Sequence, residues 1–334
     1  MRRFCGLLAL ALALTGGMAA SALAADKITG MFPTWPGFAP VLVAGDMGYF
    51  AEEGLEVETR FEDDRANVLA AMQRGDIDLD MRTVGEHQGR PRDASTPGVI
   101  IGTIDLSLGG DGVVVDQSIK DPADLKGKLF TVEPNIPARL LMQLELKKAG
   151  LTLDDLEIRD IATADSIAVF SDTSVAAVAT YEPYLSQMLK LTARPDARLL
   201  VSSKDYPGII TDVIVARNDE LAKNPEKYRK LLRGIYRAVD LYKKDPGKFI
   251  ELAAPHFNLS PAEVKEILDT SLTYTTYEEA MEFMGPKGGQ GKLHEVFTTV
   301  MDLNLENGAA ETRLDAAQQI DNSVVQGLFA GKQR

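Results

Sequence analysis

Short runs of apolar residues with strand spacing alternate with runs of helical spacing along the first part of the chain. Strands, marked by alternating or continuous apolar residues, are predicted at 27–32, 55–61, 77–81 and 99–105. A helix is predicted at 40–49, and Asp63 or Asp64 can cap a second one that ends at Gly75. This order of elements predicts an α/β fold with a mostly parallel sheet covered by helices.

A second series of the same kind follows Gly109 and Gly110. Its strands are predicted at 112–115, 128–132, 175–180 and 209–216, and a helix is predicted at 138–149. From Asp219 onward the spacing is almost wholly helical, for example at 225–244 and 261–272. The pattern therefore predicts two α/β lobes and a helical C-terminal tail that packs back on them.

The first 24 residues have the pattern of a secretory signal peptide. Arg2 and Arg3 precede an apolar run at 7–14, and the sequence Ala-Leu-Ala at 22–24 supplies a small-residue cleavage site. We predict that the chain is exported and cleaved after Ala24. The single cysteine, Cys5, lies in the removed segment, so no disulfide or thiol chemistry is expected in the mature chain.

The charge of the chain narrows the range of partners. The sequence has 49 acidic and 36 basic side chains and a formal net charge of −13. Removing the predicted signal peptide, which carries two arginines and no acids, leaves −15. This excess of negative charge disfavours nucleic acids and anionic membrane surfaces as partners.

Motifs of several enzyme classes are missing from the sequence. The three histidines, His87, His256 and His294, lack metal-ligand spacing, and the sequence contains neither HExxH nor the Gly-x-Ser-x-Gly elbow. The glycine-rich stretch at 285–292 lacks the first glycine and the preceding strand of a phosphate loop, so we interpret it as a turn. No catalysis, no metal and no cofactor are expected.

Several stretches are specific in combination: TWPGFAPVLVAGDMGYFAEEGLEVE at 34–58, and then AAMQRGDIDL, LSLGGDGVVV, DLKGKLFTVE, KKAGLTLDDLEI, VAAVATYEPYLSQ and SSKDYPGIITDVIVARNDEL. With these stretches nearly the whole mature chain resembles the periplasmic substrate-binding proteins of ABC importers. The branch is the nitrate/taurine/alkanesulfonate group, which includes the NMT1-like, thiamine-pyrimidine-binding proteins. One departure is the sequence Ser-Asp-Thr-Ser at 171–174, where relatives usually carry a turn that contains glycine.

The resemblance implies a two-lobe periplasmic-binding-protein clam-shell of type II. Lobe 1 would comprise residues 25–110, lobe 2 would comprise 111–212, and 213–334 would return to lobe 1, with crossings near 109–113 and 210–213. The implied function is a monomeric periplasmic receptor that closes on a small organic solute and presents it to an ABC permease with its ATPase. The alternatives are a binder of alkanesulfonate or nitrate-type anions, a ligand sensor for a membrane receptor, and an enzyme of the thiamine-pyrimidine type.

Loops at the carboxyl ends of strands are expected to supply the pocket. Trp35 offers either a stacking surface for a planar or cationic ligand or a wedge between helices. Glu182 lies between two tyrosines at the end of a predicted buried strand. It can serve either as an acid that stabilises the start of the next helix or as a ligand contact. By resemblance, Asp212 corresponds to an acid that meets the amino group in taurine-type relatives. Two carboxylates in one dry cleft favour a ligand with a cationic or donor-rich group.

We predict a ligand site built from both lobes. Tyr181 and Tyr184 are not expected to face inward together, and Tyr184 is preferred. Asn135 precedes a predicted helix whose first backbone N–H groups are suited to an anionic end. The full predicted set is Trp35, Phe38, Thr83, Glu86, His87, Ser107, Asn135, Glu182, Tyr184 and Asp212.

Overall fold

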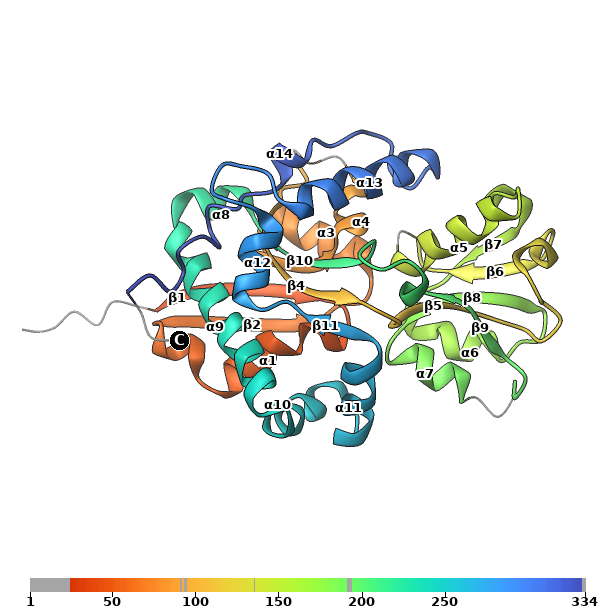
Figure 1. Cartoon of the computed structure of the whole chain (residues 1–334), viewed down its shortest axis with the longest axis horizontal. Helices are drawn as coiled ribbons and strands as arrows, with labels where there is room; N and C mark the ends of the chain where they lie inside the picture. Colours follow the sequence, from red (N-terminus) through yellow and green to blue (C-terminus); the bar gives the residue numbers. More distant parts are fainter. Residues whose placement is uncertain (1–24, 91, 93–94, 135, 191–193, 332–334) are drawn as a thin grey trace, which may run out of the picture.

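The strands gather into two separate sheets, which form the cores of two lobes (Figure 1). The computed structural model describes residues 25–331 except 91, 93–94, 135 and 191–193. Within these residues the larger lobe has a six-stranded sheet in the order β11-β4-β10-β3-β1-β2. Its strands are β1 (Asp26–Phe32), β2 (Leu55–Phe61), β3 (Leu79–Thr83), β4 (Val99–Ser107), β10 (Thr211–Ala216) and β11 (Leu272–Tyr274).

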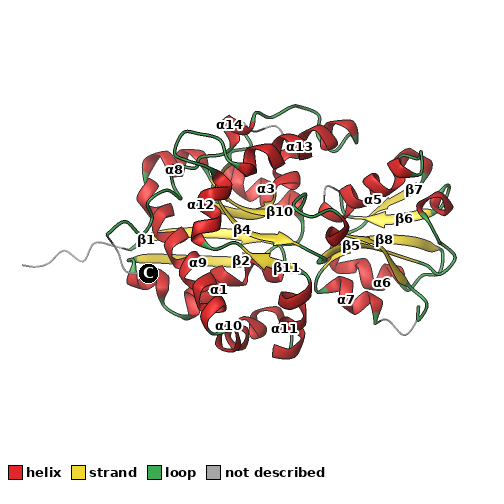
Figure 2. Ribbon diagram, viewed as in Figure 1, coloured by secondary structure: helices red, strands yellow, loops and turns green. Residues whose placement is uncertain are grey.

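The described part of the smaller lobe has a five-stranded sheet in the order β7-β6-β8-β5-β9. Its strands are β5 (Asp111–Val115), β6 (Leu129–Val132), β7 (Glu157–Asp160), β8 (Val175–Tyr181) and β9 (Arg198–Ser202). Helices cover both faces of each sheet (Figure 2). In the smaller lobe these are α5 (Pro137–Lys148), α6 (Ser166–Phe170) and α7 (Tyr184–Leu189), with short 3-10 turns η2 (Pro122–Leu125), η3 (Leu153–Asp155), η4 (Thr163–Asp165) and η5 (Ser203–Asp205).

The larger lobe carries the remaining helices, including the whole C-terminal part of the chain. They are η1 (Pro36–Phe38), α1 (Ala39–Asp46), α2 (Tyr49–Glu52), α3 (Arg65–Arg74), α4 (Val84–Gln88), α8 (Asn218–Lys223), α9 (Pro225–Lys244), α10 (Pro246–Ala253), η6 (Ala254–Phe257), α11 (Pro261–Thr270), α12 (Tyr277–Met284), α13 (Lys292–Glu306) and α14 (Ala316–Gln319). No helix in the described ranges combines the length and the apolar character needed to cross a membrane.

Local sequence sets the limits of the helices. The Asp64 carboxylate caps α3 by accepting a hydrogen bond from the Ala66 N–H at 2.8 Å, and Gly75 ends the helix with a φ of 80°. The helix predicted at 40–49 is divided into α1 and α2 because Gly48 adopts a φ of 73° between them. The stretch at 285–291 is the predicted turn, between α12 and α13.

Both sheets are mixed, so the prediction of a mostly parallel sheet is wrong. In the larger sheet, β1 pairs in parallel with β2 and β3, but β10 pairs antiparallel with both β3 and β4. The reason is that β10 is the strand on which the chain returns from the smaller lobe. In the smaller sheet β5 is likewise antiparallel to β8 and β9.

Two segments carry the chain between the lobes. The first joins the end of β4 at Ser107 to the start of β5 at Asp111, and the second joins η5 to β10. Asp212 and Val213 already pair with β3 and β4 of the larger sheet. The second crossing therefore ends before Thr211, slightly earlier than the predicted 210–213.

Candidate ligand-binding site

The register of β10 brings polar residues together at the edge of the larger sheet that faces the smaller lobe (Figure 1). Asp212 pairs with Thr83, the last residue of β3, and with Asp105 near the end of β4. Because β10 runs antiparallel to both neighbours, its first residues lie beside their last ones. Strand β10 therefore places Asp212 at the edge of the sheet where β3 and β4 end.

A small cavity lies at this edge, between the lobes. Aromatic rings form much of its wall, and three carboxyl groups and one guanidinium group also line it. Apolar walls with a few placed polar groups are typical of small-molecule sites. The lining residues are Pro33, Trp35, Phe38, Arg65, Thr83, Glu86, Asp111, Pro137, Tyr181 and Asp212.

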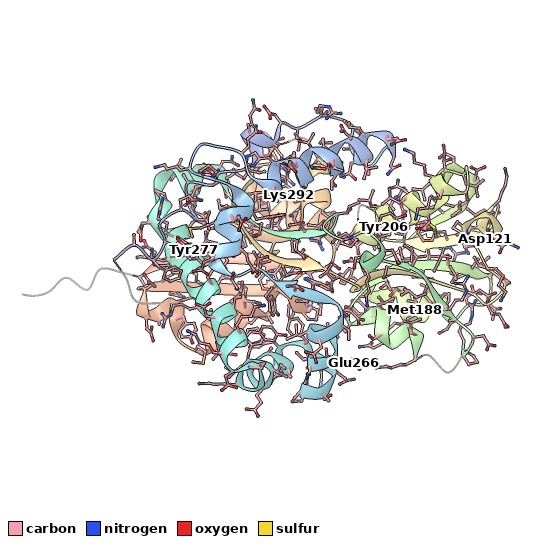
Figure 3. The ribbon with its side chains drawn as sticks, in the orientation of Figure 1. Asp121, Met188, Tyr206, Glu266, Tyr277 and Lys292 are labelled. Atoms are coloured by element: carbon pink, nitrogen blue, oxygen red, sulfur yellow. The ribbon has the colours of Figure 1, made fainter. Side chains whose placement is uncertain are left out.

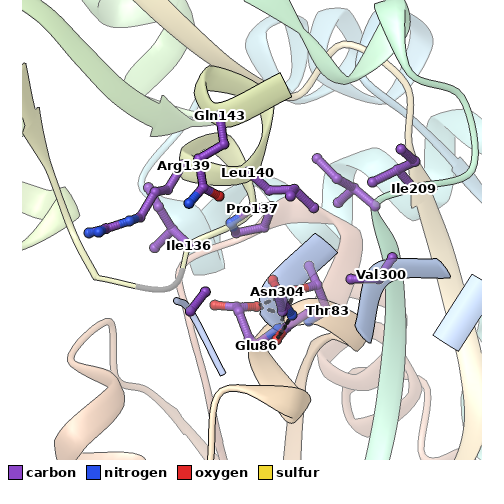
Figure 4. Close-up of a pocket in the computed structure, with 13 residues that line it drawn as sticks. Thr83, Glu86, Ile136, Pro137, Arg139, Leu140, Gln143, Ile209, Val300 and Asn304 are labelled. Atoms are coloured by element: carbon purple, nitrogen blue, oxygen red, sulfur yellow. Dashed lines mark hydrogen bonds between the residues drawn. The ribbon is translucent and has the colours of Figure 1, made fainter. Parts of the chain in front are cut away.

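Two further hollows adjoin this cavity. One extends between α4 and α13 of the larger lobe and α5 of the smaller lobe, where Thr83 and Glu86 face Pro137 across the gap (Figure 4). The other is lined by Arg82, Arg90 and Glu133 together with Arg65 and Glu86. Glu86 borders all three spaces, so the spaces meet around its side chain.

Asp105 and Asp212 form a buried acid pair. Asp105 lies behind the cavity wall, and its side chain is close enough to that of Asp212 for one carboxyl to donate to the other. Burial raises the pKa of Asp105 to about 7, and hydrogen bonds from Asp212 and Trp35 oppose this rise. Burial, together with the charges of Asp105, Asp111 and Glu86, raises the pKa of Asp212 well above its usual range. At neutral pH the pair therefore retains a proton.

Asp111 adds a third acid from the first crossing. Its side chain is buried at the start of β5, and burial raises its pKa to about 7. The Oδ1 atom of Asp105 is also buried and lacks a hydrogen-bond partner among the described residues. Within those residues no group of three or more His, Cys, Asp or Glu side chains is arranged to hold a metal ion. The site thus gathers three buried aspartates, Asp105, Asp111 and Asp212, each with a raised pKa.

Trp35 connects the acid pair to the smaller lobe. Its indole Nε1 donates to Asp105 Oδ2 at 3.3 Å, and its ring lies edge-on to Tyr181 with centroids 6.4 Å apart. A Cβ added at Gly37 would overlap the indole nitrogen, and one added at Gly110 would overlap the far edge of the ring. The absence of side chains at these two glycines makes room for Trp35 in the wall of the cavity.

Thr83 and Glu86 form a capping box at the start of α4. The Thr83 N–H and hydroxyl each donate to Glu86 Oε2 at 2.9 Å, and the Glu86 N–H donates to Thr83 Oγ1 at 3.2 Å. The second carboxylate oxygen of Glu86 forms an ion pair with Arg65 Nη2. Both predicted residues, together with Phe38, lie in the cavity wall.

Tyr181 and Tyr184 of the smaller lobe both reach Asp63 of the larger lobe, but only one of them lines the cavity, and it is Tyr181 and not the preferred Tyr184. The Tyr181 and Tyr184 hydroxyls donate to the Asp63 carboxylate at 3.2 and 3.4 Å. Asp63 also accepts from the Thr34 N–H and hydroxyl at 2.6 and 3.0 Å. Tyr181, the last residue of β8, lines the cavity, whereas Tyr184, the first of α7, does not.

Glu182 has the helix-end role and not the predicted ligand contact. Its carboxylate accepts from the Ser186 hydroxyl at 2.6 Å and from the Ser186 N–H at 3.2 Å, in the first turn of α7. The side chain is buried and is not among those that line the cavity. The physical reason is the pleat of β8, which directs Tyr181 to the cavity and the next residue to the other side.

Two more predicted residues lie outside the cavity wall. His87 is buried between α4 and the C-terminal part of the chain, with Nε2 3.0 Å from Gln319 Oε1, and burial lowers its pKa well below the usual value. The Ser107 hydroxyl lies 2.8 Å from the Ser203 hydroxyl and ties together the two crossing segments. Asn135 lies outside the described residues.

The predicted set lacks five residues of the cavity wall and the buried Asp105 behind it. The five are Pro33, Arg65, Asp111, Pro137 and Tyr181. Asp105 and Asp111 interrupt strands that are otherwise apolar, and a buried acid of this kind is a signal that sequence reading can use. Arg65, in contrast, has the ordinary place of a polar residue in the first turn of a helix. Only the tertiary arrangement brings it to the cavity.

Two lobes with a mixed sheet each, two crossings and a cavity between them define a protein with the periplasmic-binding-protein fold. The model of the NMT1/THI5-like family matches residues 35–248, and the chain belongs to this family.

Two individual proteins are similar to this chain in sequence. A protein of Brucella abortus (strain 2308), named only as a binding protein, is 25% identical over 281 residues, which cover 81% of this chain and 84% of the relative. The 4-amino-5-hydroxymethyl-2-methylpyrimidine phosphate synthase of Aspergillus parasiticus is 24% identical over 275 residues, with coverage of 78% and 77%.

Two solved structures share the architecture. The alkanesulfonate-binding protein SsuA from Xanthomonas axonopodis pv. citri, bound to MOPS, superposes with a TM-score of 0.73 at 17% identity and covers 90% of this chain and 99% of its own. The nitrate-binding protein NrtA from Synechocystis PCC 6803 has a TM-score of 0.72 at 13% identity, with coverage of 92% and 89%. At such identities these structures establish the fold and not the ligand.

Proposed function

We propose that this chain is an exported solute-binding receptor of an ABC import system, whose ligand is a small organic solute with an amino or other donor-rich group. The proposal rests on one observation above all. Asp105, Asp111 and Asp212 are buried together beside an interlobe cavity, and each has a raised pKa. Such a group of acids suits a ligand that brings positive charge or several hydrogen-bond donors.

The chemistry of the pocket follows from desolvation. Buried carboxyl groups retain protons because the loss of hydration of their ionised forms outweighs the hydrogen bonds that they accept. A ligand ammonium group would change this balance, since it donates charge-assisted hydrogen bonds and offsets the repulsion between the acids. Trp35, Phe38 and Tyr181 supply apolar walls and aromatic faces, to which a cation is also attracted.

The lobes are suited to close on such a ligand. The site draws groups from both of them, and Asp63 of the larger lobe already holds two tyrosines of the smaller one. Ligand that contacts both lobes favours the closed form, which an ABC permease and its ATPase can distinguish from the open form. In this role the protein works in the periplasm as a monomer, after removal of a signal peptide.

A second candidate is an enzyme of pyrimidine synthesis. The observation in its favour is the relative from Aspergillus parasiticus, which is named as a phosphate synthase of an aminopyrimidine. A binding protein returns its ligand unchanged, whereas a synthase forms product. Mass spectrometry of ligand recovered after long incubation with the protein separates these two functions.

The proposal is tested by a thermal-shift screen of a solute library, followed by calorimetry. A bound solute at about a hundred times its Kd adds roughly 2.7 kcal/mol to the free energy of unfolding. We expect the solutes that stabilise the protein to carry amino or other donor-rich groups. Asp212→Asn should weaken their binding about ten- to hundredfold, because a charge-assisted hydrogen bond in a buried site contributes about 1.5–3 kcal/mol.

Glu251→Gln, on the exposed surface of α10, is the matched control and should bind normally. The proposal is wrong if the stabilising solutes lack donor groups, or if Asp212→Asn binds them as tightly as the unchanged protein does.

A further inference from the structure

The carboxylate of Asp63 joins the two lobes through hydrogen bonds from both of them. Oδ1 accepts from the Thr34 N–H at 2.6 Å and from the Tyr181 hydroxyl at 3.2 Å. Oδ2 accepts from the Thr34 hydroxyl at 3.0 Å and from the Tyr184 hydroxyl at 3.4 Å. Each oxygen therefore accepts from one donor of its own lobe and one donor of the opposite lobe. We refer to Asp63, Tyr181 and Tyr184 as the interlobe latch.

The larger lobe fixes the position of Asp63 without help from the smaller one. Thr34 lies in the loop after β1, and Asp63 precedes the residue that caps α3. Because Thr34 donates to both carboxylate oxygens, Asp63 keeps its direction and two of its donors when the smaller lobe moves away. In an open cleft the phenol hydroxyls can donate to water instead. The interlobe latch can therefore release and re-form without leaving a buried polar group unpaired.

The interlobe latch is better shielded from water than the lysine pairs that also connect the lobes. Tyr181 is buried and Tyr184 half-buried, and their rings pack edge-on with centroids 5.9 Å apart. Burial raises the pKa of Tyr181 well above its usual range and that of Tyr184 to about 12, so both hydroxyls remain donors at neutral pH. Shielded hydrogen bonds to a carboxylate contribute more than an exposed ion pair such as that of Lys147 with Glu306.

Most of the interlobe latch lies outside the ligand space. Neither Asp63 nor Tyr184 is among the residues that line the interlobe cavity or the two adjoining hollows, whereas Tyr181 lines the cavity. The contacts of Asp63 with the two tyrosines therefore need no ligand to complete them.

We propose that the interlobe latch holds the lobes together without any ligand, so that the closed form is well populated in the unliganded protein, and that Asp63 is a positioning residue for closure. The inference goes beyond the proposed function, because it applies to a solute of any chemistry. The apparent affinity of closed lobes for a solute is proportional to the fraction of unliganded molecules that are closed. The interlobe latch thus raises the affinity for every solute by the same factor, whereas a ligand contact distinguishes between solutes.

The test measures the distance between the lobes in the absence of solute. The predicted mature chain has no cysteine, so spin labels can be attached through Asn67→Cys on α3 and Gln187→Cys on α7. Both positions are exposed and lie about one helical turn beyond the interlobe latch. Double electron–electron resonance then gives the distribution of distances between the labels. We expect a population with a short distance in the protein with an intact latch.

Replacing both tyrosines, as Tyr181→Phe with Tyr184→Phe, removes the two hydroxyls but keeps the rings and the bonds between Asp63 and Thr34. We expect this double variant to lower the ratio of short to long distances at least about tenfold, because hydrogen bonds to a charged group are lost. Lys147→Gln is the matched control, since it breaks an exposed contact between the same lobes. It should leave the distribution unchanged.

Asp63 could instead act only by holding the loop of Thr34. Asp63→Ala removes both roles, and its combination with the double variant separates them. If Asp63 acts through the tyrosines, the triple variant is no more open than Asp63→Ala alone, because the same hydrogen bonds are already lost. If it acts only through Thr34, the effects of the tyrosine and Asp63 replacements add.

A long distance alone in the unliganded protein overturns the inference, and so does a short-distance population that survives the loss of both hydroxyls. Additive effects in the triple variant overturn the positioning role of Asp63. None of these results affects the proposed function, which solute binding tests. A solute screen without a hit would in turn leave this measurement valid, because no solute takes part in it.

Discussion

At the scale of single residues, the raised pKa values of the acids at the interlobe cavity predict that stability and ligand binding depend on pH. The pKa of Asp105 is raised from 3.8 to about 7, so the folded protein retains a proton that the unfolded chain loses near pH 4. In the ligand-free protein the free energy of unfolding therefore falls as the pH rises from about 4 to about 7, and Asp111 acts in the same direction.

A cationic ligand reverses this trend, because it favours the ionised carboxyl groups. An amine remains protonated over this range. We therefore predict that its Kd falls between pH 5.5 and 8, by at most about tenfold per pH unit for each proton released. Calorimetry in buffers with different ionisation enthalpies counts those protons. Asp212→Asn should flatten the profile, and a Kd that is independent of pH in the unchanged protein would contradict the assignment.

The sequence places some residues of the site correctly and others wrongly, because it does not show which residue at a strand end points toward the cavity. Trp35, Phe38, Thr83, Glu86 and Asp212 could be placed near the site because each follows or begins a strongly apolar element. Which side of a strand end faces the cavity depends on the pleat, and a shift of one residue exchanges the two sides. For this reason the sequence places Glu182 in the cavity wall, whereas in the structure its neighbour Tyr181 lines it.

At the scale of elements, the predictable ones are those whose apolar residues have regular strand or helix spacing. The strand at 55–61 and the helix at 225–244 match β2 and α9 residue for residue. β7 and β9, at the two edges of the smaller sheet, were not predicted, because β7 is exposed along its whole length and β9 along part of it. The antiparallel direction of β10 depends on the crossing and has no local signal.

The geometry of the first crossing depends on Gly110, because a side chain at this position would not fit. The Gly110 N–H donates to the Ser271 carbonyl at 3.0 Å, and a Cβ at Gly110 would overlap the Trp35 ring. We predict that Gly110→Ala displaces Trp35 or the crossing, lowers the free energy of unfolding by about 1–3 kcal/mol and weakens ligand binding. Denaturant unfolding and calorimetry measure the two effects.

Gly45→Ala is the control for this substitution, since nothing lies within 4 Å of a Cβ at that position in α1. Its stability should be unchanged or slightly higher, because alanine favours a helix more than glycine does. Equal behaviour of the two variants would show that the contact between Gly110 and Trp35 does not constrain the crossing.

At the scale of the whole molecule, side chains from the two lobes meet on several sides of the cavity. Asp63 holds Tyr181 and Tyr184 on one side. Elsewhere Lys147 of α5 pairs with Glu306 of α13 at 2.6 Å, and Lys190, just after α7, lies 3.4 Å from Glu266 of α11. Figure 3 shows Glu266 on the side of the larger lobe that borders the smaller one, and Tyr206 on the second crossing. The two lysine pairs are exposed and contribute little energy, so we expect the tyrosine contacts to matter more for holding the lobes together.

Trp35 is the only tryptophan in the sequence, and it lies where the lobes meet. Its fluorescence therefore reports on the cavity directly. When a donor-bearing solute that raises the melting temperature is titrated into the protein, we predict a saturable change in Trp35 emission with the calorimetric Kd, and Asp212→Asn should shift that curve to higher concentration. A solute that stabilises the protein and binds with a measurable Kd, but leaves Trp35 emission unchanged, would contradict the claim that the ligand is held between the two lobes.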